Sequence, residues 1–153
     1  MKKALFTLLA VVLFTATVAA QDRNSTVGLR VGYQSGISVV YQDNLTDNLF
    51  LEGNATYSWQ MAGGQLDLTV DYTFLKAGNF NFYAGLGLAG LYYSYEGKSI
   101  WGIGGAGNLG VEYKFSGPFS LAITWKPEYY YLPEYKEGLA NLANVGLSFH
   151  FWF

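Results

Sequence analysis

The stretch Gly64–Leu75, GQLDLTVDYTFL, alternates apolar and polar residues along almost its whole length. One side of the alternation holds Leu66, Leu68, Val70, Tyr72 and Phe74. The other side holds Gln65, Asp67, Thr69, Asp71 and Thr73. Because successive side chains of a β-strand point to opposite faces, this pattern predicts a strand with one apolar face and one polar face.

The same period of two recurs along the chain and predicts eight strands. They cover residues 26–34, 36–42, 48–60, 64–75, 80–94, 100–115, 119–131 and 139–153. Turn-forming residues fill the gaps, and no helical period is present. The sequence therefore predicts an all-β, eight-stranded antiparallel up-and-down barrel. Pro127 removes a backbone N–H inside the seventh predicted strand, so we expect a bulge there.

The composition excludes several classes of function. The 153 residues include no Cys, 13% are charged and 18% aromatic, and the formal net charge is −2. The lack of Cys excludes disulfide scaffolds and thiolate metal sites, and the small net charge argues against binding nucleic acid by phosphate neutralisation. After the N-terminal segment no apolar run reaches the ~18 residues of a membrane-spanning helix.

Residues 1–20, MKKALFTLLAVVLFTATVAA, have the organisation of a secretory signal peptide. Lys2 and Lys3 form the basic start, an apolar run follows, and small residues precede Gln21. A transmembrane anchor fits less well, because the segment is short and ends in small residues. We expect cleavage after residue 20, a single barrel domain over residues 21–153, and neither a cofactor nor a metal in the exported protein.

Alternation alone fits two barrels: a soluble, lipocalin-like barrel with an apolar interior, and a membrane barrel with an apolar exterior. All charged residues of the predicted strands fall on the face opposite the apolar one. That face is also rich in Gly, Ala and Ser, which the narrow lumen of an eight-stranded barrel requires and a solvated outer face does not. The sequence therefore favours a transmembrane β-barrel with its bulky apolar side chains outside.

Aromatic residues on the apolar face form two bands on either side of an aliphatic belt. One band contains Tyr57, Trp59, Tyr92, Trp101, Tyr129 and Tyr131. The other contains Tyr72, Phe74, Phe82, Tyr113, Phe115 and Phe119. Two aromatic girdles match the two interfaces of a bilayer. We prefer this interpretation to a sugar-binding platform built on Trp125 and residues 129–131.

The polar face predicts a network inside the lumen. Its members are Arg30, Glu52, Asp67, Asp71, Glu112, Lys114, Lys126, Glu128 and His150. Because buried charges require partners, we expect a salt-bridged plug; a narrow polar path for water, ions or a small solute is the alternative. We expect Glu52 and Asp71 to be neighbours, with Arg30 as the candidate cation between them.

Two motifs that can carry chemistry have simpler explanations here. His150, the only His, lies near Ser120 and Ser148 on the predicted strands, but it faces the lumen, so we expect no hydrolase and no other catalytic site. Residues 102–107 spell GxGxxG, which marks a dinucleotide site only between a strand and a helix. Within a strand the glycines more simply allow close packing.

Residues 80–88, FNFYAGLGL, and 145–153, VGLSFHFWF, together with the signal peptide, resemble the small eight-stranded outer-membrane barrels of Gram-negative bacteria. That superfamily includes OmpX, OmpW and the opacity-type, porin-family barrels. The resemblance implies a C-terminal signal, read by the outer-membrane insertion machinery, at Gly146, Phe149, Phe151 and Phe153.

The same resemblance implies a monomer in contact with outer-membrane lipids and lipopolysaccharide, handled by periplasmic chaperones during biogenesis. From the small net charge we expect no nucleic-acid partner. The predicted outer loops are short, unlike those of adhesins. We therefore expect a structural, envelope-stabilising role, with a narrow porin-like path as the alternative and a lipid-A-acting hydrolase as a third interpretation.

Overall fold

The alternating sequence forms ten strands in the computed structural model, which describes residues 25–33, 35–58 and 62–153. The strands are β1 (Ser25–Gly32), β2 (Gly36–Asn44), β3 (Leu49–Ser58), β4 (Gly63–Ala77), β5 (Phe80–Tyr95), β6 (Lys98–Lys114), β7 (Phe119–Trp125), β8 (Glu128–Leu132), β9 (Glu137–Asn141) and β10 (Val145–Trp152). The predicted signal peptide and Trp59 lie outside the described residues. In the described ranges we find no helix that is both long enough and apolar enough to cross a membrane.

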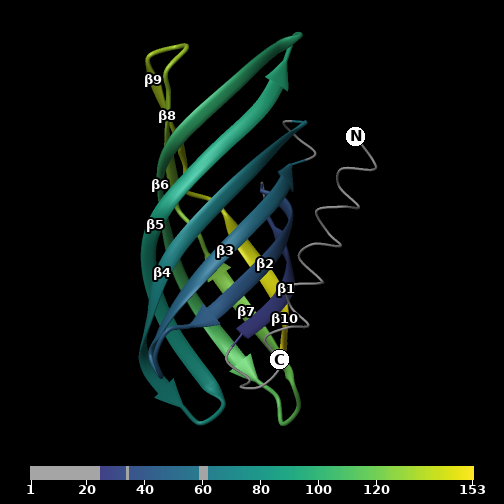
Figure 1. The fold of residues 1–153 in the computed structure, drawn as a ribbon, viewed down its shortest axis with the longest axis vertical. Coiled ribbons are helices and arrows are strands. Elements are labelled where there is room, and N and C mark those ends of the chain that lie inside the picture. The colour runs from purple at the N-terminus through teal and green to yellow at the C-terminus, as the bar shows by residue number, and fades with distance from the viewer. Residues whose placement is uncertain (1–24, 34, 59–61) are drawn as a thin grey trace.

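All strand pairs are antiparallel, and the sheet closes on itself. Strands β1 to β6 pair in chain order, and β1 also pairs with β10, from Thr26–Trp152 to Gly32–Gly146. Strands β7 and β8 both pair with β6, while β10 pairs with β7 and β9 with β8. Strands β7 and β8 follow one another at one position around the barrel, and β9 and β10 do so at the next. The ten strands therefore fill eight positions, and the predicted eight-stranded antiparallel barrel is confirmed (Figure 1).

Two predicted strands are interrupted. Residues 119–131 divide into β7 and β8, and residues 139–153 divide into β9 and β10. Pro127 interrupts its strand but adds no extra residue, since β7 and β8 keep one register on β6. The predicted bulge at Pro127 is therefore wrong: the extra residue lies in the facing segment, 142–144. A second, unpredicted irregularity shifts the register between Thr73 and Leu75.

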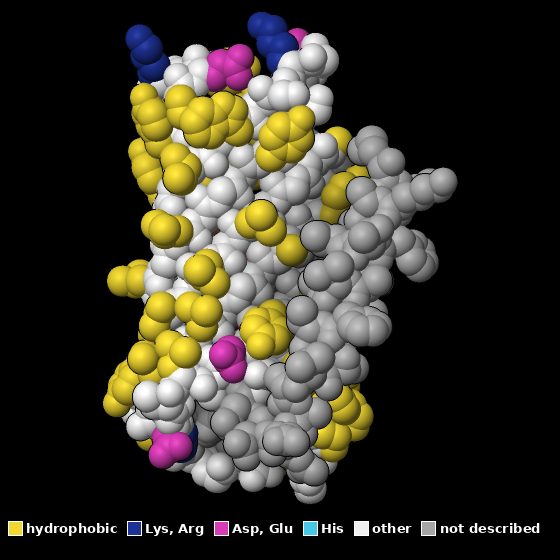
Figure 2. All heavy atoms as spheres, in the orientation of Figure 1, with side chains coloured by type: hydrophobic (Ala, Val, Ile, Leu, Met, Phe, Trp, Pro, Cys, Tyr) yellow, Lys and Arg dark blue, Asp and Glu magenta, His cyan; other side chains and the backbone are white. Residues whose placement is uncertain are grey.

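The barrel places its apolar side chains outside. Alternate residues of β5 illustrate this: Leu86 and Leu88 are exposed, whereas Tyr83 and Ala89 are buried. Figure 2 shows hydrophobic side chains distributed over the described part of one outer face, with Lys or Arg side chains near both ends. The inside carries the buried charges, as predicted from the small and polar residues of that face.

The barrel is much taller on one side than on the other. Strands β5 and β6 have 16 and 17 residues, against 8 each for β1 and β10. The β5–β6 and β8–β9 hairpins extend beyond the other strands at the end of the barrel opposite the C-terminus (Figure 1). Their inner faces form a small apolar cluster that we call the cap: Ala89, Leu91, Ile100, Ala106, Tyr130 and Leu132.

Candidate functional site in the lumen

Lys126 is the centre of the buried network. It lies in the break between β7 and β8, where its side chain is 1% exposed. Its Nζ atom is 2.9 Å from Glu52 Oε1 and 2.6 Å from Asp67 Oδ1. These three side chains form what we call the charged cluster. Lys126, rather than the predicted Arg30, is thus the cation that pairs with Glu52 on β3 and with Asp67 on β4.

Three neutral side chains complete the charged cluster. Gln42 Nε2 donates to Glu52 Oε2 at 2.7 Å, and Asn108 Nδ2 donates to Glu52 Oε1 at 3.2 Å. Asn54 Nδ2 donates to Glu52 Oε1 and to Asp67 Oδ1, both at 3.0 Å. These three amides were not predicted as members of the network, although their places on the polar face were a usable signal. Because amides supply donors without charge, they let two carboxylates share one lysine.

Arg30 is buried but stands apart from the acids. Its Nε donates to Thr124 Oγ1 at 2.9 Å, and its Nη1 to Ser35 Oγ at 3.2 Å. Its Nη2 donates to Asn144 Oδ1 at 2.8 Å. No carboxylate of the described residues lies within ion-pair distance of this guanidinium. The prediction that Arg30 separates Glu52 from Asp71 is therefore wrong.

Asp71 and Glu128 flank the charged cluster without direct cationic partners in the described ranges. Asp71 is 0% exposed, and its Oδ2 accepts from Thr69 Oγ1 at 2.6 Å. Its register partner on β3 is Phe50, while Glu52 pairs with Thr69, so the two acids are not directly opposite. Glu128 Oε1 accepts from Gln65. The network is therefore held together by neutral donors as much as by ion pairs.

A second polar group surrounds Glu112 near the chain termini. Ser120 Oγ donates to Glu112 Oε1 at 2.6 Å, and His150 Nδ1 lies 3.5 Å from the same oxygen. Trp152 Nε1 donates to Ser120 Oγ at 2.9 Å, and Lys114 Nζ lies 3.8 Å from the centroid of the Trp152 ring. Lys114 is only half-buried. Across the described parts of the chain, no three His, Asp or Glu side chains converge closely enough to hold a metal ion.

An aromatic partition separates the two polar groups. Phe50 and Tyr83 meet edge to face with centroids 5.2 Å apart, and Tyr83 is 2% exposed. On the side nearer the termini, this pair borders a polar cavity of about 50 Å³ that Glu112 and Lys114 also line. Because a water molecule needs only about 10–15 Å³ of such volume, the cavity has room for a few waters.

The lumen is therefore layered. From the termini upward it contains the polar cavity, the aromatic partition, the charged cluster and the cap. The inward positions of Tyr83 and Tyr130 were predicted, but the apolar layers on either side of the charged cluster were not. A charged cluster held between two largely apolar layers is an obstacle to ions, since each layer offers a single tyrosine hydroxyl in place of lost hydration.

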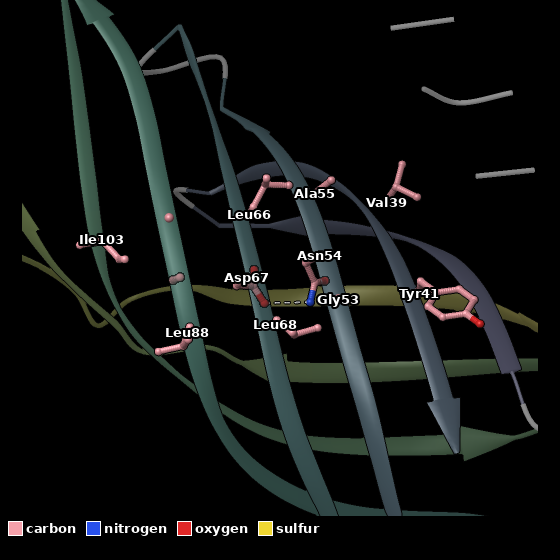
Figure 3. Close-up of a pocket in the computed structure, with 12 residues that line it drawn as sticks. Val39, Tyr41, Gly53, Asn54, Ala55, Leu66, Asp67, Leu68, Leu88 and Ile103 are labelled. Atoms are coloured by element: carbon pink, nitrogen blue, oxygen red, sulfur yellow. Dashed lines mark hydrogen bonds between the residues drawn. The ribbon is translucent and has the colours of Figure 1, made fainter. Parts of the chain in front are cut away.

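The outer wall carries the aromatic residues predicted as girdles. Nine of them are exposed: Tyr57, Tyr72, Phe74, Tyr92, Trp101, Phe115, Phe119, Tyr129 and Tyr131. Phe82 and Tyr113 are half-buried. Between the bands, small residues such as Gly53 and Ala55 open a shallow groove beside Leu66 and Leu68 (Figure 3).

The residues of the predicted C-terminal signal divide between the two faces of β10. Phe149 and Phe151 are exposed on the outer wall, and Phe153 is half-buried at the chain end. Gly146 faces the lumen, where a Cβ atom would overlap the Arg30 guanidinium. Gly146 therefore provides space for a buried arginine, whatever its part in biogenesis.

Comparisons with known proteins support the architecture. No protein-family model and no curated protein matches the sequence. Among solved structures, the N-terminal β-barrel domain of OprF from Pseudomonas aeruginosa matches with a TM-score of 0.68 and 17% identity, over 85% of this chain and 96% of that one. A structure described as a de novo design of transmembrane β-barrels matches with a TM-score of 0.57 and 18% identity, over 87% and 98%. The chain therefore has the fold of eight-stranded outer-membrane barrel domains.

Proposed function

We propose that this chain is an integral outer-membrane protein of a Gram-negative bacterium with a structural, envelope-stabilising role. The observation that carries the proposal is that apolar side chains face outward and charged ones inward. Leu86 is 78% exposed, whereas Asp71 is 0% exposed. Continuous apolar surface beyond a few hundred Å² is rare on soluble monomers. In a bilayer, acyl chains cover such a wall, and a closed barrel leaves no backbone group unpaired there.

The layered lumen supports a structural role over a transport role. The partition of Phe50 and Tyr83 and the cap place apolar side chains inside the barrel on either side of the charged cluster. We propose that the protein acts through its surface, on the acyl chains of lipids and on lipopolysaccharide. The polar cavity beside Glu112 favours the second candidate, a narrow path for small solutes, because it already opens part of the lumen.

A hydrolase receives no support from the geometry. Ser120 and His150 both contact Glu112, and of the described side chains Glu112 is the one to which the Ser120 hydroxyl donates. Both residues are buried in the lumen, where lipid does not reach them. We therefore propose a non-enzymatic protein.

The route to the membrane is also part of the proposal. Residues 1–20 would direct export, and Phe149, Phe151 and Phe153 would be read by the insertion machinery after transport by periplasmic chaperones. Exposure of two of these rings on the outer wall is consistent with recognition before closure of the barrel. Membership of the superfamily of OmpX and OmpW is proposed on the same residues.

Two measurements on the mature chain test the proposal. Refolded into lipid vesicles, it should migrate faster on gels when unheated than after boiling, and in planar bilayers it should give no steady conductance steps. A folded monomer in buffer without any amphiphile would contradict the membrane location. Regular single-channel steps would instead establish the transport candidate.

A further inference from the structure

The β8–β9 hairpin, Glu128–Asn141, is joined to the barrel through two chain interruptions that face each other. Lys126 and Pro127 separate β7 from β8, and residues 142–144 separate β9 from β10. The Lys126 N–H donates to the Asn144 carbonyl at 2.8 Å, which places the two interruptions side by side. Pro127 accepts a hydrogen bond from the Gly107 N–H of β6 at 2.7 Å but has no N–H to return one to β6. Both connections of the hairpin thus leave regular strand geometry at one level of the barrel, and the connection through Pro127 lacks one hydrogen bond to β6.

The lateral support of this hairpin is also weak. Strand β8 pairs with β6 over four residues, from Ile103–Tyr131 to Ala106–Glu128, and β9 pairs with β8 alone among the described strands. The facing stretch of β6 is the GxGxxG segment, in which four of the six residues are glycine. Because glycine lowers strand stability and offers no side chain to pack, this short pairing is a weak one.

The inner face of the hairpin closes the lumen. Glu128, Tyr130 and Leu132 are all buried, and Tyr130 and Leu132 belong to the cap. The hydroxyl of Tyr130 and Oε2 of Glu128 have no hydrogen-bond partner among the described residues. Buried polar atoms without partners are costly, so part of the closed position is unfavourable.

We propose that the β8–β9 hairpin is a hinged lid on the end of the lumen opposite the chain termini, turning about Pro127 and residues 142–144. Opening separates β8 from the glycine-rich segment of β6 and admits water to Glu128 and the charged cluster. The unpaired edge of β9 agrees with a position outside the hydrocarbon, where free strand edges do not occur. This inference rests on the proposed function and adds regulation of the lumen to it.

Amide hydrogen exchange of the mature chain in lipid vesicles tests the lid. Strand β8 is the informative one, because it is paired on both sides, as β7 is, whereas the edge strand β9 exchanges readily in any case. We expect the amides of β8 to exchange at least ten times faster than those of β7. Equal rates in β8 and β7 would overturn the proposal.

A hinge variant sharpens the test. Pro127→Val restores an N–H and a strand-forming residue, so β8 exchange should slow at least threefold. Pro133→Ala, at the tip of the same hairpin, is the matched control and should leave the rate unchanged. No slowing with Pro127→Val, or equal slowing with both variants, would refute the hinge.

An engineered disulfide that locks β8 to β6 provides the second line of evidence. Because the chain has no Cys of its own, no other thiol competes with the engineered pair. Ile103→Cys with Tyr131→Cys joins direct partners of β6 and β8. Val111→Cys with Ile123→Cys joins β6 to β7 below the hinge and is the control. Partner Cα atoms in antiparallel pairs are about 4.5–5.5 Å apart, within disulfide range. The first lock should lower β8 exchange to the rate of β7, and the control should not.

Failure of the lid is distinguishable from failure of the membrane proposal. If the chain does not insert into vesicles, β7 and β10 lose protection along with β8. If it inserts and has no lid, all three remain protected. Free exchange of β8 even in the locked protein would contradict the lid while leaving the barrel intact.

Discussion

Replacing Lys126 with Met should destabilise the barrel by about 3–5 kcal/mol, the usual cost of removing one partner of a buried ion pair. The structure favours the upper part of that range, because the Lys126 side chain is 1% exposed and those of Glu52 and Asp67 are 3% and 2% exposed. The substitution leaves two carboxylates without a cation in a lumen that other side chains fill.

The two carboxylates that lose their cation, those of Glu52 and Asp67, should not contribute equally to the loss of stability. Without Lys126, Glu52 still accepts hydrogen bonds from Gln42, Asn54 and Asn108, whereas Asp67 keeps only Asn54 among the described residues. Adding Asp67→Asn to Lys126→Met should therefore recover more stability than adding Glu52→Gln. The triple variant should recover most of the loss, because it removes the uncompensated charges.

Urea unfolding of the mature protein in detergent micelles, followed by gel migration without boiling, measures these differences. Lys98→Met, on the exposed turn of the β5–β6 hairpin, is the control and should change stability by less than about 0.5 kcal/mol. A loss below about 1 kcal/mol for Lys126→Met, or a triple variant as unstable as the single one, would contradict a stabilising role for the charged cluster.

Three further substitutions probe other parts of the molecule. Gly110→Ala should cost about 1–3 kcal/mol in urea unfolding, because its Cβ would overlap the Tyr83 ring, whereas Gly117→Ala should be nearly neutral because a Cβ there meets only an ordinary contact. Ser120→Ala should cost about 1–3 kcal/mol, since Glu112 loses a donor and Trp152 an acceptor; an unchanged Trp emission and stability would contradict this. Ile123→Arg, on the outer wall, should cost about 2–4 kcal/mol in vesicles if that wall meets acyl chains, and equal tolerance of Ile123→Arg and Tyr135→Arg, at the tip of the β8–β9 hairpin, would count against a buried wall.

The strand faces could be predicted from sequence because a period of two is a local property. Leu66 and Asp67 fall on opposite sides of the wall whatever their neighbours are, and the structure places them so. The assignment of apolar residues to the outside followed from the small residues of the other face, such as Gly110, which provides space for the Tyr83 ring.

The pairing inside the lumen could not be predicted in the same way. Which cation meets Glu52 depends on the register and stagger of strands far apart in the sequence, and these are properties of the closed sheet. Lys126 reaches β3 and β4 across the lumen, whereas Arg30 lies among neutral partners near Asn144. The layering was missed for the same reason, because Phe50 and Tyr83 meet only when β3 and β5 curve toward each other.

The interruptions also depend on tertiary context. Pro127 marked an irregularity in its own strand, but the extra residue was accommodated opposite it, in residues 142–144. The donor that Pro127 lacks faces β6, which keeps its register, whereas the extra residue lies on the other side of the strand. The sequence thus predicted the height in the barrel at which the strand pairing is irregular, but it assigned the extra residue to the wrong strand.

The contact between the outer wall and lipid can be measured directly at Leu86, because a chain without Cys accepts a single spin label there. Leu86→Cys, labelled and reconstituted in vesicles, should relax readily with oxygen dissolved in the bilayer and remain protected from a water-soluble nickel chelate. A label at Leu86 that the nickel chelate reaches as freely as one on the Lys98 turn would contradict the inverted barrel.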